Sequence, residues 1–338
     1  MQEKINKVIW IIVLLLILSF IGLFIYNKNK KEEYTAKFFY MDTYIYVKLY
    51  DINKETADKY IKEIENIYKK YHELTDRYNA YDNVKNIYYI KNNDSEEEYI
   101  KIDKELYDII EYGTYYYEKT NGLVDISMGN IIDVWKKYRD NKNGIPTKEE
   151  LEKANNIVKI ELKNGTIKNN HPNIDLGSIS KGYTTKIVGE YLKKNNINKF
   201  LINAGGNVLV GDKKQNKEYT IGIENPNNKN DIFKIVKGDN IAVVTSGGYE
   251  RYYEYEGKKY HHIINPKTLY PSNNMKSVTV ITSDSALGDI LSTYLFLLDI
   301  DEGKEYINNL DNVEAIWYTN DNKEIKSNGF DKYEYKTK

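Results

Sequence analysis

The sequence predicts an α+β fold in which antiparallel sheets are flanked by helices and preceded by one N-terminal transmembrane helix. Two observations predict it. Runs of alternating apolar residues are separated by amphipathic helical segments, and several runs are joined by hairpin-like turns instead of regular crossovers. The chain also opens on a long uncharged apolar run. No Pro/Ser-rich linker follows, so we expect an anchor and tether over residues 1–35 and one compact domain over 36–338.

Residues 8–26 form the apolar run. As a helix they would span about 28 Å, close to the thickness of a bilayer core. Trp10 and Tyr26 lie near its two ends, where aromatic side chains favour the membrane interface. A cleaved signal peptide would be shorter and end in small residues, whereas this run ends in large ones, so we expect an uncleaved anchor. Lysines flank both ends and do not fix its orientation.

The elements of the compact domain follow from local patterns. Apolar alternation indicates strands, apolar residues at helical spacing indicate helices, and glycine or asparagine marks the turns between them. Ser283 or Asp284 is placed to cap the last predicted helix. In chain order we expect a strand at 44–50, helices at 55–74, 103–119 and 181–195, a strand at 200–210 interrupted by Gly205 and Gly206, a meander over 219–224, 232–237 and 241–245, a hairpin around Gly257, a strand at 277–282, and a helix ending near Leu298.

Composition excludes several classes of function. The 338 residues include 49 basic and 50 acidic side chains, so no basic excess is available for binding nucleic acid. Cysteine is absent, which excludes disulfides, thiolate zinc sites, iron–sulfur clusters and cysteine nucleophiles. Because the chain has only four histidines, the groups available to bind a metal are mostly oxygen donors, which suit Mg²⁺ or Ca²⁺.

Asp289 and Thr293 are four residues apart on the last predicted helix, so their side chains share one helical face. Their neighbours along the helix are apolar. A buried carboxylate needs a partner, and a hard cation is one candidate. The alternative is an exposed Asp289 at the solvent edge, with Thr293 bonded to a backbone carbonyl. The pair by itself favours this alternative.

Three glycine-containing segments and one pair of histidines are further candidates. Residues 175–183 are expected to end a strand and open a helix, where backbone N–H groups and Lys181 suit an anion, although an ordinary turn is the alternative. Residues 203–207 and 245–248 each end an apolar strand with a glycine pair, which is usually a turn. His261 and His262 are adjacent on a strand and point to opposite faces, so at most one of them faces a given site.

Seven segments, taken in order, resemble the FAD:protein FMN transferase family, the ApbE-like flavin transferases. They read MDT at 41–43, TNGLVDISMGNIIDVW at 120–135, DLGSISKGY at 175–183, NAGG at 203–206, TSGGYERY at 245–252, HIINPKT at 262–268, and SVTVI from 277 with its continuation to Thr293. The resemblance covers nearly all of 36–338. It implies the family's T-fold-like architecture, and its set of motifs is specific although each motif alone is weak.

The resemblance implies Mg²⁺-dependent transfer of FMN from FAD to a Thr or Ser hydroxyl of an acceptor protein with a flavinylation motif, releasing AMP. By position, the metal ligands would be the backbone carbonyl of Ser178 with Asp289 and Thr293. The incoming hydroxyl needs a base, and we expect His262 to act as general base because the intrinsic pKa of histidine suits that role. The implied flavin-site positions are Met41, Tyr78, Leu123, Val124, Asp125, Asp175, Lys181, Asn203, Gly205, Gly206, Thr245, Ser246, Gly247 and His262.

Three departures and two alternative functions stay open. The family's usual Asp-Pro-x-Thr-Gly after the histidine has Asn265 and Leu269 here, and Asp42 stands where glycine is common. The same site would serve an FAD pyrophosphatase giving FMN and AMP, and a membrane-tethered FAD-binding protein is the other alternative. The predicted anchor is consistent with a single-pass protein of the cell membrane whose catalytic domain lies outside the cytoplasm, where it would modify extracytoplasmic redox proteins; the sidedness itself stays open.

Overall fold

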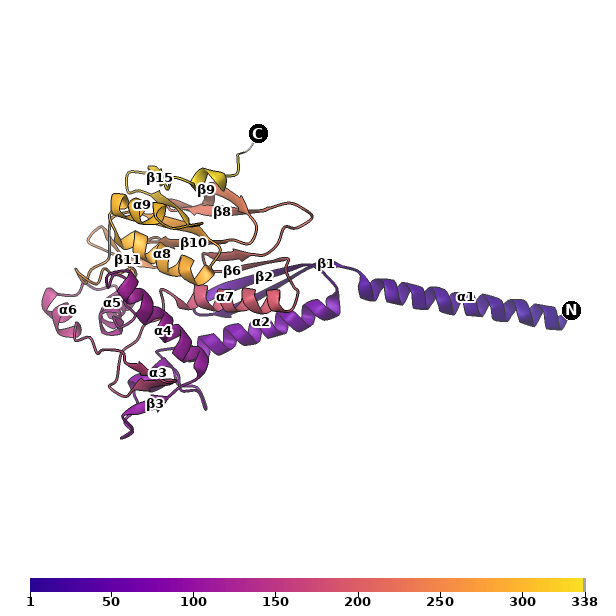
Figure 1. Ribbon diagram of the computed structural model, residues 1–338, viewed down its shortest axis with the longest axis horizontal. Coiled ribbons are helices and arrows are strands. Elements are labelled where there is room, and N and C mark those ends of the chain that lie inside the picture. Colours follow the sequence, from indigo (N-terminus) through magenta and orange to yellow (C-terminus); the bar gives the residue numbers. More distant parts are fainter. Residues whose placement is uncertain (337–338) are drawn as a thin grey trace.

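The computed structural model describes residues 1–336, and within them all side chains except those of residues 2–4, 8, 22–29 and 229. Its antiparallel sheets are flanked by helices, which confirms the predicted α+β class (Figure 1).

An eight-stranded sheet forms the centre of the molecule, in the order β1-β2-β6-β7-β10-β13-β14-β15. Every neighbouring pair in it is antiparallel. The predicted strands at 44–50 and 277–282 are confirmed within this sheet. The strand expected at 200–210 is instead two antiparallel strands, because the chain reverses direction at Gly205 and Gly206. Its strands are β1 (Glu32–Tyr40), β2 (Thr43–Ile52), β6 (Phe200–Ala204), β7 (Asn207–Val210), β10 (Ala242–Gly247), β13 (Ser277–Thr282), β14 (Glu314–Tyr318) and β15 (Glu324–Lys326).

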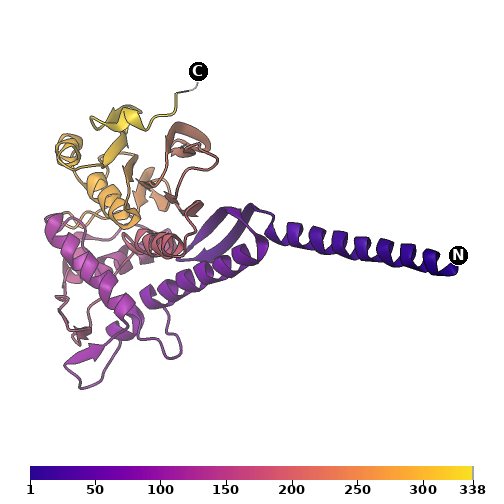
Figure 2. The ribbon, with the colours of Figure 1, turned by 45° about the vertical axis from the view of Figure 1, so that its right-hand side comes forward.

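Helices α2 (Lys54–Thr75), α7 (Ser180–Lys194) and α8 (Ser285–Leu297) pack on one face of this sheet (Figure 2). The predicted cap of α8 is Asp284, whose carboxylate accepts from the backbone N–H groups of Ala286 (2.9 Å) and Leu287 (3.2 Å). Helix α8 is buried on nearly all sides because it lies against α7, β10 and β13. The polar side chains of α8 therefore need partners inside the protein.

A hairpin of β8 (Tyr219–Asn225) and β9 (Asn228–Gly238) covers the opposite face of the sheet, together with the short helix η1 (Phe330–Lys332). The other elements surround these layers, and Figure 1 shows β3, α3 and the neighbouring α5 and α6 away from the β8–β9 hairpin. They are α3 (Ile87–Lys91), β3 (Tyr99–Lys101), α4 (Lys104–Lys119), α5 (Gly129–Asn141), α6 (Lys148–Ala154), β4 (Leu162–Lys163), β5 (Thr166–Lys168), β11 (Tyr252–Tyr255), β12 (Lys258–His261) and α9 (Ile300–Asn308).

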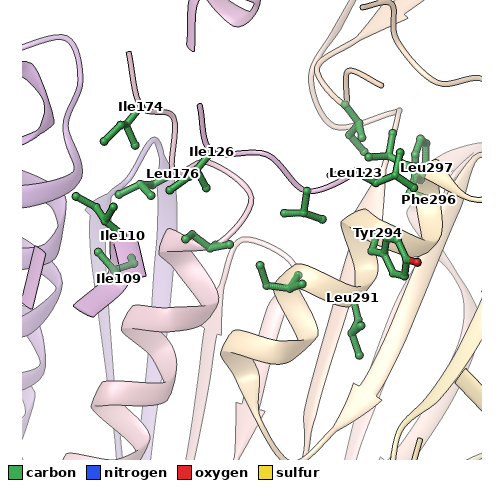
Figure 3. Close-up of a cluster of buried hydrophobic side chains, with 14 of the residues drawn as sticks. Ile109, Ile110, Leu123, Ile126, Ile174, Leu176, Leu291, Tyr294, Phe296 and Leu297 are labelled. Carbon is green, nitrogen blue, oxygen red and sulfur yellow. The ribbon is translucent and has the colours of Figure 1, made fainter. Parts of the chain in front are cut away.

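The largest apolar core joins α4, the segments around residues 123–126 and 174–179, and helix α8. Figure 3 shows Ile110, Ile126 and Leu176 from three separate segments among its buried side chains. Leu123 belongs to the same core as Phe296 and Leu297 at the end of α8. The core therefore fixes the segment 123–126 and the start of α7 relative to the helix that carries Asp289.

Helix α1 (Gln2–Asn29) extends away from the folded domain (Figure 1). Among the residues that the structure describes, no helix combines the length and the apolarity needed to cross a membrane. The predicted transmembrane helix is therefore not confirmed. Residues 8 and 22–26 of the predicted span have side chains outside the described set.

Three further local expectations are wrong. The expected meander is not continuous, because β8 and β9 pair only with each other while β10 lies in the central sheet. Strand β1 begins at Glu32, inside the stretch expected to be a tether, because Tyr34, Ala36, Phe38 and Tyr40 alternate inward against α2 and β2. No strand precedes α7: residues 169–175 are irregular, and the Asp175 N–H donates to the Ile126 carbonyl (2.8 Å). This bond and the one from the Gly129 N–H to the Asn173 carbonyl (3.0 Å) join the two segments where a strand ladder was expected.

Candidate functional site

Two tight turns meet at one end of the central sheet. Strand β2 pairs with β6, with Ile45 opposite Ala204, so the turn at Met41 and Asp42 lies beside the turn at Gly205 and Gly206. All four turn residues have positive φ, between 53° and 87°, as two-residue hairpin turns require. A Cβ on Gly205 would lie 2.2 Å from Thr43 Oγ1, so only glycine fits.

Strand β10 reaches the same end of the sheet. The Thr245 N–H donates to the Gly206 carbonyl (3.0 Å), and Gly247 ends the strand. Asn203 lies on β6 opposite Tyr46 of β2. The structure therefore brings the predicted positions on β1–β2, β6–β7 and β10 into one region.

Asp289 is buried, with 6% of its surface exposed. Its Oδ2 accepts from the backbone N–H of Gly182 (2.5 Å), near the N-terminus of α7. Its Oδ1 accepts from Asn207 Nδ2 (3.1 Å), at the start of β7. A Cβ on Gly182 would lie 2.8 Å from Asp289 Cβ and 2.4 Å from the Ser285 carbonyl, so glycine permits this close approach. The alternative of an exposed Asp289 is therefore wrong, because α7 and β7 enclose the carboxylate.

Thr293 lies one helical turn further along α8 and belongs to a group of hydroxyls. Ser246 Oγ lies 2.8 Å from Ser292 Oγ and 3.4 Å from Thr293 Oγ1. Ser292 Oγ in turn donates to the Asp289 carbonyl (3.1 Å). The predicted site positions on β10 and α8 are thus in direct contact through Ser246.

Ser178 completes the predicted set of metal ligands. In a continuing helix its carbonyl would accept from the Gly182 N–H, but that N–H donates to Asp289. The described residues contain no group of three or more His, Asp or Glu side chains arranged to hold a metal ion. The predicted set differs from such a group, since it has one carboxylate, one hydroxyl and one carbonyl. These oxygen donors, with a carboxylate oriented by two N–H groups, fit a hard cation such as Mg²⁺.

Arg77, which the sequence reasoning missed, joins three segments beside the predicted flavin positions. Only 7% of it is exposed. It pairs with Asp175 Oδ2 (Nη1, 3.0 Å) and Asp133 Oδ2 (Nη2, 3.0 Å), and Nη2 also donates to the Gly129 carbonyl (2.9 Å). Such a buried cation needs several partners. Its position beside Tyr78 in the chain was the only signal that could have pointed to it.

Tyr78 and Asp175 both bond to Nη1 of this guanidinium. Arg77 Nη1 donates to Tyr78 Oη (3.3 Å), and 48% of Tyr78 is exposed. Asp175 Oδ1 also accepts from the Gly177 N–H (2.9 Å), which shapes the turn before α7. The structure thus links Tyr78 and Asp175 through Arg77 and leaves about half of the tyrosine exposed.

The segment 123–125 is packed into the protein and does not form an open binding loop. Leu123 and Val124 are buried in the main core, and Asp125 Oδ1 accepts from Ser127 Oγ (2.5 Å) and from the Ser127 N–H (2.8 Å). Leu123 also lines a cavity of about 420 Å³ with residues of α8 and α9, but Asp289, Thr293 and His262 do not line it. Contacts from Leu123 and Val124 to a flavin would therefore come mainly from backbone atoms.

His262 is exposed to solvent, directly after β12. Its N–H and Nδ1 lie 3.1 and 3.2 Å from the Arg251 carbonyl, which can only accept. Nδ1 therefore carries the proton and Nε2 is a free base. The surrounding protein partly desolvates the ring, which lowers the pKa of His262 although the residue keeps exposed surface. The positive charges of Arg251 and Lys181 lower this pKa further. The imidazole is consequently neutral at pH 7.

Arg251 also connects His262 to the first turn. Its Nη2 lies 3.2 Å from both the carbonyl and the carboxylate Oδ2 of Asp42. Asp42, one of the departures from the family pattern, thus gains a partner at a left-handed position that glycine would occupy without strain. His261 faces the other way, as predicted: it is buried, and its Nε2 bonds to the Ser272 carbonyl.

The two other departures keep the loop after His262 in place. Asn265 Oδ1 accepts from the Lys267 N–H (2.9 Å), a turn that an aspartate would also make. Leu269 has a φ of 64° where the family has glycine. Its side chain is buried with Trp135, whose Nε1 donates to the Leu269 carbonyl (2.8 Å). Burial of the leucine therefore offsets the strain of its backbone.

Leu269→Gly is expected to lower the free energy of unfolding. It relieves roughly 1–2 kcal/mol of left-handed strain but removes a buried leucine, a loss of about 2–5 kcal/mol. The expected net change is roughly 1–3 kcal/mol, measured by urea denaturation. Leu269→Met keeps the buried volume and should lower it less. A Leu269→Gly variant at least as stable as the parent would contradict this account.

Comparison with known proteins agrees with the resemblance. The model of the ApbE family matches residues 41–317. "FAD:protein FMN transferase" of Klebsiella pneumoniae is 41% identical over 149 residues, covering 43% of this chain and 45% of that protein. The enzyme of that name from Vibrio cholerae is 31% identical over 193 residues, covering 54% and 58%. The chain thus spans about half the length of these curated relatives.

Solved structures share the fold. The ApbE protein of Thermotoga maritima has a TM-score of 0.80 at 24% identity, over 90% of this chain and 100% of that one. The flavin transferase ApbE of Vibrio cholerae has a TM-score of 0.75 at 21% identity, again over 90% and 100%. Since the family model covers most of the folded domain, the chain belongs to the ApbE family.

Proposed function

We propose that this protein transfers FMN from FAD to a Ser or Thr hydroxyl of an acceptor protein, with Mg²⁺, and releases AMP. The observation that carries the proposal is the buried Asp289 carboxylate, oriented by Gly182 and Asn207 beside the hydroxyls of Ser246 and Thr293. The curated relatives named for this activity support it. The acceptor protein would be a partner that carries a flavinylation motif.

Ser178, Asp289 and Thr293 would hold the cation through a carbonyl, a carboxylate and a hydroxyl. The chemistry that bound Mg²⁺ supplies in such sites is stabilisation of negative charge on phosphate oxygens. Lys181 follows Ser180 at the start of α7 and adds a positive charge close enough to His262 to lower its pKa. The positive charge of Lys181 at this helix start therefore suits the diphosphate of FAD.

His262 would remove the proton from the acceptor hydroxyl. The hydroxyl oxygen forms a bond to the phosphorus of the FMN moiety, the diphosphate P–O bond breaks, and AMP leaves with its own phosphate. The proton passes to Nε2, which the bond between Nδ1 and the Arg251 carbonyl leaves unprotonated. Tyr78 is half exposed and Met41 lies in the β1–β2 turn. Both would contact the flavin ring.

The full-length chain with FAD and Mg²⁺, with and without an acceptor protein, tests this proposal. Covalent FMN on the acceptor by mass spectrometry, with an equal amount of AMP, is the expected result. Free FMN and AMP without labelled acceptor would replace the transferase by an FAD pyrophosphatase. Tight FAD binding without AMP in either arm would leave a binding protein and overturn the proposal.

We also propose, from the sequence alone, that the uncharged run 8–26 anchors the protein in the cell membrane, with the catalytic domain outside the cytoplasm. The full-length chain is expected to stay in the membrane fraction after carbonate extraction. A Leu15→Asp, Leu18→Asp double variant should be released, because charges at the centre of a span are unfavourable. Release of the parent chain, or equal retention of both, would contradict the anchor.

A further inference from the structure

Asn207 is fully enclosed by protein beside the predicted metal site. It is fully buried at the start of β7, directly after the Gly205–Gly206 turn. Its Nδ2 lies 3.1 Å from Asp289 Oδ1 and 3.2 Å from the Ser285 carbonyl. Its Oδ1 accepts from Ser285 Oγ (2.7 Å). The whole amide is therefore bonded, as a buried polar group requires.

These partners fix which way the amide points. The Asp289 carboxylate and the Ser285 carbonyl can only accept, so both need the NH₂ end. The Ser285 hydroxyl donates to the other end. If the amide were flipped, Asn207 Oδ1 would face the Asp289 carboxylate and the Ser285 carbonyl, which are both acceptors. The Ser285 hydroxyl therefore holds the Asn207 amide in the orientation that donates an N–H to Asp289.

The same carboxylate is held on its other oxygen by the Gly182 N–H. Asp289 is therefore fixed from two elements other than its own helix, α7 and β7. Each carboxylate oxygen can accept more than one bond, so both keep capacity for a cation. Partners that orient a ligand without touching the metal tune its affinity.

We propose that Asn207, oriented by Ser285, is a positioning residue for the metal-binding carboxylate of Asp289. The proposal rests on the metal site of the proposed function. Asn207 fixes the orientation of the Asp289 carboxylate before a cation binds. The carboxylate therefore loses less conformational freedom on binding, which raises the affinity for the cation. Ser285 acts one step further away, by keeping the amide from turning.

The test measures cation binding by the full-length chain without FAD. Loss of the free Mn²⁺ signal in electron paramagnetic resonance gives the Mn²⁺ affinity, and competition gives that of Mg²⁺. Asn207→Ala is expected to weaken both affinities roughly 10–100-fold. Ser285→Ala keeps the donor and should weaken them less. The spectrum of bound Mn²⁺ is expected to broaden in Asn207→Ala as the carboxylate becomes mobile.

Two controls separate the possible outcomes. Tyr68→Phe removes another buried hydrogen bond, the 2.8 Å contact with Thr185 Oγ1, and should lower the melting temperature without changing cation affinity. Asp289→Ala should abolish binding. If Asp289→Ala weakens binding but Asn207→Ala and Ser285→Ala bind like the parent, the positioning role is wrong and the metal site stands. If the parent does not bind, or Asp289→Ala binds equally well, both proposals fall.

Discussion

Asp289→Ala is expected to lower FMN transfer and AMP release together by at least about 10³-fold. Bound cations contribute several kcal/mol to phosphoryl-type transition states, and each 1.4 kcal/mol is about tenfold in rate. The variant also leaves the Gly182 N–H and Asn207 Nδ2 buried without their acceptor. The measurement is the initial rate of AMP release and acceptor labelling at saturating Mg²⁺.

Asp289→Ala is expected to lower both the stability of the fold and the catalytic rate, so the two must be measured separately. Two unsatisfied donors cost roughly 1–3 kcal/mol each, so a lower melting temperature is expected. Asp301→Ala removes an exposed carboxylate on α9 and should change neither quantity. A folded Asp289→Ala enzyme that works within tenfold of the parent would show that the carboxylate does not hold the cation.

His262→Ala is expected to lower kcat by about 10²–10⁴-fold at saturating FAD, the usual contribution of a general base. The pH dependence provides a second readout. Because the pKa of His262 lies below its usual value, the base stays neutral at pH 6.5, and kcat/KM should fall only below that pH. The profile of kcat/KM reports the free enzyme, the state in which this pKa applies.

His171→Ala is the matched control for this prediction. His171 is exposed, bonds to the Lys91 carbonyl and is not one of the predicted site positions, so transfer should be unchanged. An acid limb at or above pH 6.5 in the parent would contradict the lowered pKa. Near-normal transfer by His262→Ala would remove the histidine from the role of base.

The predictable part of the fold is the part with a strong local pattern. The helix at 55–74 was predictable because one apolar stripe faces the sheet, and the helix ending near Leu298 because Asp284 caps it. Strand β14 was not, because Glu314–Tyr318 is short, and its pairing with β13 and β15 is set by distant residues. Helix α5 likewise depends on packing around Trp135, which no local spacing reveals. The start of α6 was readable, because Thr147 and Glu150 form a capping box.

The candidate site divides in the same way. Helical spacing placed Asp289 and Thr293 on one face, but their spacing alone favoured an exposed Asp289. Its burial depends on Gly182 and Asn207, which are about 80 to 110 residues away in the chain. The family resemblance supplied the identities of the implied ligands. It did not supply Arg77, Asn207 or Ser285, because what these residues do depends on which atoms enclose them.

Helix α8 packs against α7, β10 and β13, and it carries the carboxylate that α7 and β7 orient. Proteins are synthesised from the N-terminus, so residues 285–297 emerge after nearly every other contributor to the site. A nascent or prematurely terminated chain that lacks α8 would therefore contain the two glycine turns of the site but not the carboxylate and hydroxyl proposed to bind the cation. Under the proposed function, cleavage of FAD would wait until translation of the domain is almost complete.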